Sequence, residues 1–284
     1  MITNRMIKTC PDSEKTLLVP ALSAKTHSAG MIIRALEQTL SHFSPIRLEE
    51  MDSITLQDRV DTKFILPVEL LVPVLDAVMK EYQILTIDGN RINHYRTVYF
   101  DTPDFYLFNL HVNGNAERYK VRSREYLESG QTFFEVKYKT RKDRTIKNRK
   151  PTSQAITKVD AEAKKWLKKT CPLESTNLEA KIWNTFSRIT LANIERSERA
   201  TIDFDILFSN GDNEKRLDGI AIIEIKSDRQ IKNSPLREEL FSRRIHPSGF
   251  SKYCIGTALL YTGVKKNALK PQILWIEKIS QGVI

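Results

Sequence analysis

Basic side chains stand at every second position in one stretch of the chain. Arg118, Lys120, Arg122 and Arg124 alternate with residues of another kind, and a similar alternation continues after a turn at Gly130. Successive side chains of a β-strand point to opposite faces, so this spacing predicts two strands that each have a cationic face. Arginine forks and lysine ammonium groups are good donors to phosphate oxygens. The spacing therefore favours the binding of an anion that carries several phosphates.

Two segments add a carboxylate to this pattern. Glu135 precedes Lys137 by two positions, and Glu224 precedes Lys226 in the same way. Carboxylate oxygens bind hard divalent cations, which in turn bridge phosphates. Glu224 and Glu135 are thus candidate ligands for Mn²⁺ or Mg²⁺. An ordinary ion pair between neighbouring strands is the alternative for each.

The number of cations limits how such strands can be arranged. If they close into a barrel with the charged faces inward, each uncompensated pair of cations at 5 to 6 Å repels by roughly 3 kcal/mol at an effective dielectric constant near 20. A bound polyanion would relieve that repulsion. For any single strand, a sheet face open to water is the alternative. Aromatic residues alternate with the cations, whereas single-stranded nucleic-acid sites place both on one face, so a chain of phosphates is favoured over nucleic acid.

Hydrophobic periodicity and turn residues predict a mixed α and β chain. We expect strands over 59–66, 84–87, 94–101, 117–127, 132–140, 186–191, 198–209 and 219–227, and helices over 69–82, 105–110, 158–169, 177–185 and 251–261. Residues 1–30 are predicted to be a flexible extension, residues 31–57 a helical lead-in, and residues 58–284 one catalytic domain.

Composition excludes several classes of protein. The 284 residues include 45 Lys and Arg against 35 Asp and Glu, a net charge of +10, which favours an anionic partner. Three widely spaced cysteines fit neither a disulfide framework nor a zinc site. There is no apolar run of about 18 residues, so no transmembrane segment is expected, and the cysteine usage predicts a cytoplasmic location. The P-loop and dinucleotide-binding glycine motifs are both missing from the sequence.

Seven short motifs follow one another along the chain. They are Arg59-Val-Asp-Thr-Lys63, Tyr99-Phe-Asp-Thr-Pro103, Arg118-Tyr-Lys-Val-Arg122, Glu135-Val-Lys137, Ser187-Arg-Ile-Thr190, Glu224-Ile-Lys226 and Phe250-Ser-Lys-Tyr253. In this order the motifs resemble the vacuolar transporter chaperone (VTC) domain, the polyphosphate polymerase branch of the triphosphate tunnel metalloenzymes. The resemblance extends from about residue 58 to the C-terminus.

This resemblance implies an α+β fold with a closed eight-stranded antiparallel β-barrel, a tunnel flanked by helices. It also implies a metal-dependent phosphotransferase that moves the terminal phosphoryl group of a nucleoside triphosphate, such as ATP, to inorganic polyphosphate. The matching positions imply catalytic roles for Arg122, Arg124, Lys137, Arg188, Arg199 and Lys226, substrate binding by Lys63, Lys147, Ser251 and Lys252, and metal binding by Glu224. Strand parity and local charge add Lys120 and Arg144 as substrate ligands and Glu135 as a metal ligand. Capping of the last helix is the alternative role for Ser251.

Other functions stay open at this point. Tunnel triphosphatases and cyclases carry Glu-x-Glu-x-Lys where this chain has Arg59-Val-Asp61-Thr-Lys63, and the loss of acidic ligands favours chain synthesis over hydrolysis. A receptor for polyphosphate or inositol phosphates without catalysis is a second alternative. A nucleic-acid binder is supported by net charge alone and is not expected. The sequence gives neither the nucleotide preference nor the oligomeric state.

Overall fold

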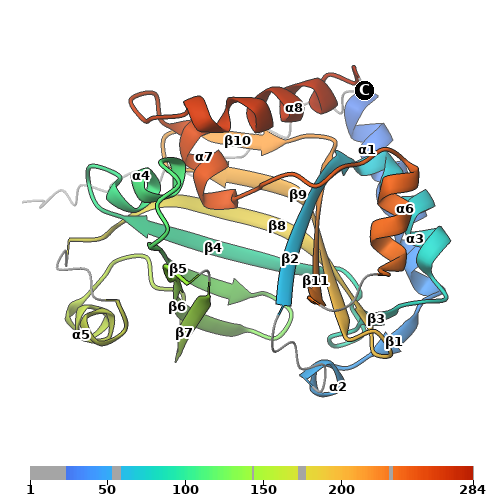
Figure 1. Ribbon diagram of the computed structural model, residues 1–284, viewed down its shortest axis with the longest axis horizontal. Coiled ribbons are helices and arrows are strands. Elements are labelled where there is room, and N and C mark those ends of the chain that lie inside the picture. The colour runs from blue at the N-terminus through green and yellow to red at the C-terminus, as the bar shows by residue number, and fades with distance from the viewer. Residues whose placement is uncertain (1–23, 53–58, 143, 172–176, 230–232, 284) are drawn as a thin grey trace, which may run out of the picture.

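The computed structural model describes residues 24–52, 59–142, 144–171, 177–229 and 233–283. Eight strands form one continuous antiparallel path within a larger sheet (Figure 1). In spatial order they are β2 (Arg59–Pro67), β11 (Ile220–Asp228), β9 (Glu198–Ser209), β8 (Glu179–Asn193), β4 (Asn93–Asp101), β5 (Arg118–Tyr126), β6 (Gln131–Lys139) and β7 (Thr145–Thr152). Three short strands, β1 (Ser44–Ile46), β3 (Gln83–Leu85) and β10 (Glu214–Leu217), extend the sheet outside this path.

The predicted α+β class with eight antiparallel strands is confirmed, although the strand over Thr145–Thr152 was not expected from the sequence. Among the described residues, no backbone pairing joins β2 to β7 at the two ends of the path, so closure of the barrel by hydrogen bonds stays a prediction. The sheet nevertheless curls strongly. Lys137 on β6 lies close enough to Asp61 and Lys63 on β2 for both charges to act on its pKa. We call the concave face of this curled sheet the bore.

Two sequence expectations about strands are wrong. Residues 177–185 were expected to be helical, but residues 179–185 form the first part of β8, where Ile182 pairs with Tyr99 and Asn184 with Thr97. Pairing with a neighbouring strand overrides the weak local pattern there. Strand alternation would place Asp205 on the same face as Asp203, yet the backbone of Asp205 has a left-handed φ of 51° at an irregularity between β8 and β9. Its side chain is exposed and forms an ion pair with Arg216.

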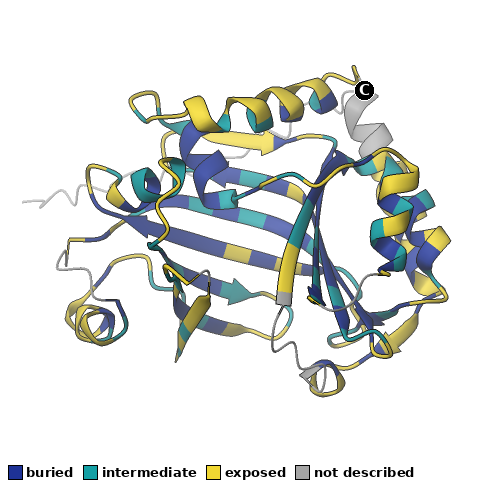
Figure 2. Cartoon of the chain, viewed as in Figure 1, coloured by how far each residue is buried: buried dark blue, intermediate teal, exposed yellow. Residues whose placement is uncertain are grey.

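Helices cover the convex face of the sheet near both ends of the strand path. Three of them, α1 (Ala24–Ser41), α3 (Leu71–Val78) and α6 (Pro235–Ser242), lie along β2, β11, β9 and β8, where Phe64, Ile202 and Ile223 enter one buried cluster (Figure 1). Helix α1 begins before residue 31, the expected start of the helical lead-in. Helix α5 (Ala161–Thr170) packs Leu167 against Phe134 and its neighbours on the other side. Figure 2 shows the buried strands beneath helices that expose their outer sides.

A third group of helices covers one end of the concave face. It contains α4 (Tyr106–Val112), α7 (Lys252–Leu260) and α8 (Lys270–Ser280), and its core includes the inward-facing Tyr95, Phe186 and Ile222. The remaining helical segments are α2 (Leu48–Asp52), η1 (Val68–Leu70) and η2 (Asn267–Leu269). No helix in the described ranges combines the length and apolar character needed to cross a membrane.

Two of the sequence motifs meet at Asp101, which is fully buried. Its carboxylate accepts hydrogen bonds from the backbone N–H groups of Leu107 (2.7 Å) and Phe108 (2.8 Å) at the start of α4, and from the hydroxyl of Tyr253 on α7. A buried carboxylate with several donors holds its neighbours firmly. Asp101 therefore fixes the start of α7, and with it Ser251 and Lys252, relative to the sheet.

Candidate phosphate-binding site

The cations expected from the sequence come together on the concave face of the sheet. Neighbouring strands pair Lys63 with Glu224, Arg188 with Asp203, and Lys120 with Lys137, and paired residues lie on the same face. The charged residues whose strand positions face the bore include Asp61, Lys63, Lys120, Arg122, Arg124, Glu135, Lys137, Lys147, Arg149, Arg188, Arg199, Asp203, Glu224 and Lys226. Cations thus outnumber carboxylates on this face.

Glu224 lies between two lysines. Its carboxylate oxygens are 3.1 Å from Lys226 Nζ and 3.8 Å from Lys63 Nζ, and 21% of its side chain is exposed. Burial raises the pKa of Glu224, but Lys226 and Lys63 outweigh burial and lower it well below its usual range. Glu224 is therefore a charged carboxylate that solvent in the bore can reach.

Glu135 has a different environment. Its side chain is 1% exposed and is bound by Arg122 Nε at 2.6 Å and by Lys147 Nζ at 2.5 Å. Burial raises the pKa of Glu135, but Arg122 and then Lys147 outweigh it and lower the pKa. This is the ion pair that the sequence left open as the alternative to metal binding. The metal role of Glu135 stays a prediction.

Asp203 forms a third ion-pair group that sequence reasoning missed. Arg188 donates two hydrogen bonds to its carboxylate, at 2.5 and 2.8 Å, and Lys252 at the start of α7 donates another. Burial raises the pKa of Asp203, and the two cations lower it strongly. Strand alternation places Asp203 on the same face as Arg199 and Thr201, but nothing in the sequence identifies Arg188 and Lys252 as its partners.

Among the further cations of the bore, Lys120, Arg124 and Lys137 have no ion pair within the described part of the chain. Lys120 donates to Ser251 Oγ at 2.9 Å, and burial lowers its pKa to about 8, with Lys63 and Arg122 adding to the shift. The side chain of Lys137 is accessible from the bore, yet surrounding protein and Lys120 lower its pKa to about 8. Arg124 is buried, and its Nε donates to Thr97 Oγ1 at 3.2 Å.

Of the remaining predicted residues, some lie at the bore and one lies outside it. Arg144 is exposed in the turn between β6 and β7, where its backbone N–H donates to Thr140 Oγ1, so the structure does not bring it into the bore. Arg199 faces the bore by register, and its guanidinium donates to the carbonyl oxygen of Met51. Ser251 caps α7 by accepting from the backbone N–H of Cys254 and also accepts from Lys120. The capping role of Ser251 is therefore confirmed, and substrate binding by Ser251 stays a prediction.

The expectation that aromatic residues lie opposite the cations is correct for Tyr119 and Phe134 on β5 and β6. It is wrong for Tyr126 and Phe133 on the same two strands, which lie on the bore side, and it is wrong on β4 and β8. Tyr119 and Phe134 pack under α5, whereas Tyr95 and Phe186 lie on the bore side with their rings stacked at 5.1 Å. Because residues 177–185 were expected to be helical, the sequence pattern did not show which side chains of β8 face the bore. On β4 the charged residues, such as Arg96, point outward, so charge did not mark the bore face there.

One metal-binding arrangement fits the residues of the bore. In the described residues no three His, Cys, Asp or Glu side chains are grouped closely enough to hold an ion. Mg²⁺ often uses only one or two protein carboxylates and takes its other ligands from phosphates and water. Glu224 supplies such a carboxylate, and the neighbouring Thr201 has a buried hydroxyl that finds no hydrogen-bond partner in the described part of the chain. A divalent cation held mainly by substrate phosphates is compatible with this pair.

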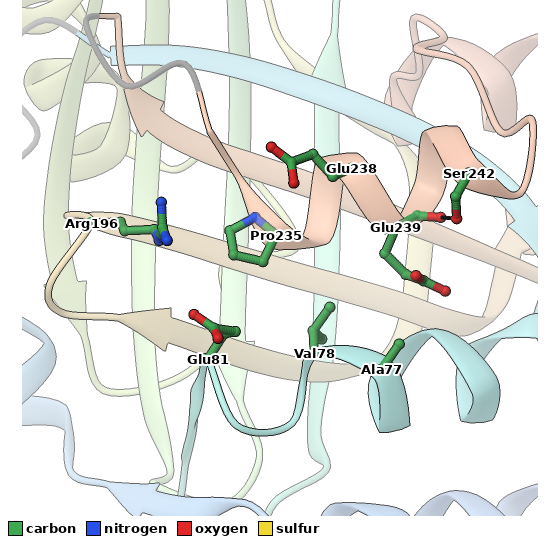
Figure 3. Close-up of a pocket in the computed structure, with 8 residues that line it drawn as sticks. All are labelled: Ala77, Val78, Glu81, Arg196, Pro235, Glu238, Glu239 and Ser242. Carbon is green, nitrogen blue, oxygen red and sulfur yellow. Dashed lines mark hydrogen bonds between the residues drawn. The ribbon is translucent and has the colours of Figure 1, made fainter.

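A separate pocket between α3 and α6 has the opposite character (Figure 3). Three carboxylates, Glu81, Glu238 and Glu239, line it together with Arg196. Negative side chains repel a polyanion, so this pocket is not the phosphate-binding site. The bore is the better candidate.

The family comparison agrees with the motifs that meet in the bore. Residues 58–261 match the model of the VTC domain. The chain belongs to the VTC domain family. No curated protein matches its sequence.

Solved structures also resemble the VTC chain. One is a candidate adenylate cyclase from Bacillus halodurans, with 14% identity, a TM-score of 0.47, and coverage of 72% of this chain and 98% of that one. Another is the PH1819 protein from Pyrococcus horikoshii, with 12% identity, a TM-score of 0.41, and coverage of 70% and 96%. A third is a Hippeastrum protein described as a candidate adenylyl cyclase with a dominant triphosphatase activity, with 13% identity, a TM-score of 0.43, and coverage of 72% and 98%.

Proposed function

We propose that this VTC protein is a polyphosphate polymerase that transfers the terminal phosphoryl group of a nucleoside triphosphate, ATP being the expected donor, to inorganic polyphosphate in the bore. The observation that carries the proposal is the group of crowded cations without carboxylate partners, Lys120, Arg124 and Lys137. Such a group destabilises the protein by itself. A polyanion that threads the bore supplies the missing negative charge.

The transfer requires positioning more than covalent participation by the protein. An oxygen of the terminal phosphate of the acceptor chain forms a bond to the γ-phosphorus, and the bond from that phosphorus to the β,γ-bridging oxygen breaks, so the nucleoside diphosphate leaves with the electron pair. The attacking oxygen is already deprotonated, and no general base is needed. Arg122, Arg124 and Arg188 would bind the phosphates in line and stabilise the charge that spreads over the transferred group.

The residues for a divalent metal in this proposal are Glu224 and Thr201. When bound, the metal would neutralise charge on phosphate oxygens and bridge neighbouring phosphates. Lys63 and Lys226 keep Glu224 ionised over the whole neutral range because they lower its pKa. Glu224 would therefore be ready to bind a metal without losing a proton.

Hydrolysis of triphosphates is the second candidate because the bore is open to water. Exposed fractions of 32% for the Lys63 side chain and 42% for that of Lys147 show that solvent reaches the cations. Against hydrolysis stands the sequence of β2, which has Arg59 and Asp61 where tunnel hydrolases carry two glutamates. Fewer acidic metal ligands favour a phosphate over water as the acceptor.

The products separate these functions directly. Purified protein is incubated with ATP and Mn²⁺, and the products are resolved on a gel. A ladder of long polyphosphate supports the polymerase, orthophosphate alone supports the hydrolase, and unchanged ATP with tight polyphosphate binding supports a receptor. A chelator should stop turnover but leave tripolyphosphate binding measurable.

Two variants test the site assignment within the same assay. Glu224→Gln should lose metal-dependent turnover, while Glu214→Gln, at an exposed position of β10, is the matched control and should behave like the parent. Arg122→Ala should weaken tripolyphosphate binding by about 1.5–3 kcal/mol, the value of one hydrogen bond between charged groups. Parent-like behaviour of both bore variants would refute the assignment.

A further inference from the structure

Three cations of the bore rest on one pair of aromatic rings. The guanidinium carbon of Arg124 lies 5.6 Å from the centroids of both Tyr95 and Phe186, and that of Arg188 lies 5.0 and 5.2 Å from them. The ammonium of Lys252 is 4.3 Å from the centroid of Phe186. The two rings are stacked with an interplanar angle of 7° and are almost fully buried. Side chains from β5, β8 and α7 thus converge on a single aromatic surface.

An aromatic face has a specific advantage as the neighbour of a phosphate-binding cation. It attracts the cation through its quadrupole and carries no net charge that would repel a phosphate. A guanidinium that lies flat on a ring keeps the N–H groups at its edge available for oxygen atoms. A carboxylate neighbour does the opposite, because it occupies donors, as Asp203 does with two donors of Arg188.

Hydrophobic packing alone does not explain this arrangement. Phe208 belongs to the same buried cluster as Tyr95 and Phe186, and its ring lies against Gly256 on α7. No cation lies over the ring of Phe208 among the residues that the structure describes. Phe186 therefore differs from Phe208, which belongs to the same core, because cations lie over the ring of Phe186.

We propose that Phe186 and Tyr95 are positioning residues that hold Arg124, Arg188 and Lys252 together, with their free donors directed at one phosphate group. The inference rests on the proposed function, because it explains how the protein holds these cations together before a polyphosphate chain binds. Asp203 already joins Arg188 to Lys252. Without the rings, repulsion would separate Arg124 from this pair, and binding would have to bring it back.

Fluorination of Phe186 tests this role, because successive fluorine atoms weaken the ring quadrupole while the shape of the side chain changes little. Mono-, di- and trifluorophenylalanine are incorporated at position 186, and tripolyphosphate binding is measured by calorimetry. Affinity should fall stepwise, to about tenfold below the parent for the trifluoro protein. In the ligand-free protein, the pKa of the Lys252 ammonium, followed by NMR, should fall with each fluorine because the ring no longer favours the charged form.

Matched proteins separate positioning from packing. The same fluorinated residues at Phe208 should change neither tripolyphosphate affinity nor the pKa of Lys252. Tyr95→Phe retains an aromatic face and should bind like the parent, whereas Tyr95→Leu should bind more weakly. Equal losses for the Phe186 and Phe208 series, or a flat response to fluorine at Phe186, would overturn the inference. If the parent itself fails to bind tripolyphosphate, the proposed function fails, and the pKa of Lys252 still decides whether the rings hold the cations.

Discussion

Replacing Lys120 by methionine should make the ligand-free protein more stable and make it bind polyphosphate more weakly. The pKa of Lys120 falls from its ordinary value of 10.5 to about 8, chiefly because of burial. That difference corresponds to about 3 kcal/mol lost from the free energy of unfolding at pH 7. The methionine side chain has a similar length and needs no counter-charge.

Two effects reduce the expected gain. Lys120 is only half-buried, so water in the bore screens part of the cost, and the variant loses the hydrogen bond to Ser251, worth about 1 kcal/mol. We expect a net gain of about 1 kcal/mol in urea unfolding at pH 7, or about 2–4 °C in Tm. The same variant should lose affinity for tripolyphosphate. Lys165→Met, on the exposed side of α5, is the control for removing one positive charge.

The pH dependence gives a second and independent check. Below pH 8 Lys120 is protonated in both the folded and the unfolded chain, so the full free-energy cost of burying its charge is present. Between pH 8 and 10.5 the unfolded chain binds more protons than the folded one, so the stability of the parent rises with pH. The advantage of Lys120→Met should therefore shrink over this window. A variant less stable than the parent at pH 7, or an advantage that stays constant up to pH 10.5, would refute the reasoning.

Three further outcomes follow from the ion pairs and the buried hydrogen bonds. Asp203→Asn should lower the free energy of unfolding by about 3 kcal/mol in urea titrations because it leaves two buried cations unpaired, whereas Asp205→Asn, which breaks an exposed pair, should change it by less than about 1 kcal/mol. Tyr253→Phe should cost about 1–3 kcal/mol, since one oxygen of Asp101 loses a buried donor, and should weaken tripolyphosphate binding by loosening the start of α7. Tripolyphosphate at a hundred times its Kd should stabilise the parent by about 2.7 kcal/mol in thermal unfolding, and the absence of any shift in Tm would contradict a polyanion site.

Alternation of charge was enough to predict the bore face on β5 and β6, because the cations there sit opposite apolar residues that α5 covers. It also identified Glu224 and Lys226 on β11. The same rule fails on β4, where the bore face is aromatic and charged side chains such as that of Arg96 point to solvent. Local sequence does not show which side chains of a strand will point to the concave face of the sheet, because the curl of the sheet depends on strands far apart in the sequence. For the same reason, the partners of Asp203 and the contact between Lys120 and Ser251 could not be predicted.

The carboxylates of the bore are distributed in a way that suits a chain of phosphates. Three of them are each shared by two cations: Glu135 by Arg122 and Lys147, Asp203 by Arg188 and Lys252, and Glu224 by Lys63 and Lys226. Every such group keeps an excess positive charge, and an interior phosphate of a polyphosphate chain carries one negative charge. Full neutralisation by more carboxylates would give a more stable protein, but each phosphate would then have to displace an acidic side chain. Partial neutralisation keeps the cations ordered and leaves the remaining charge for the ligand.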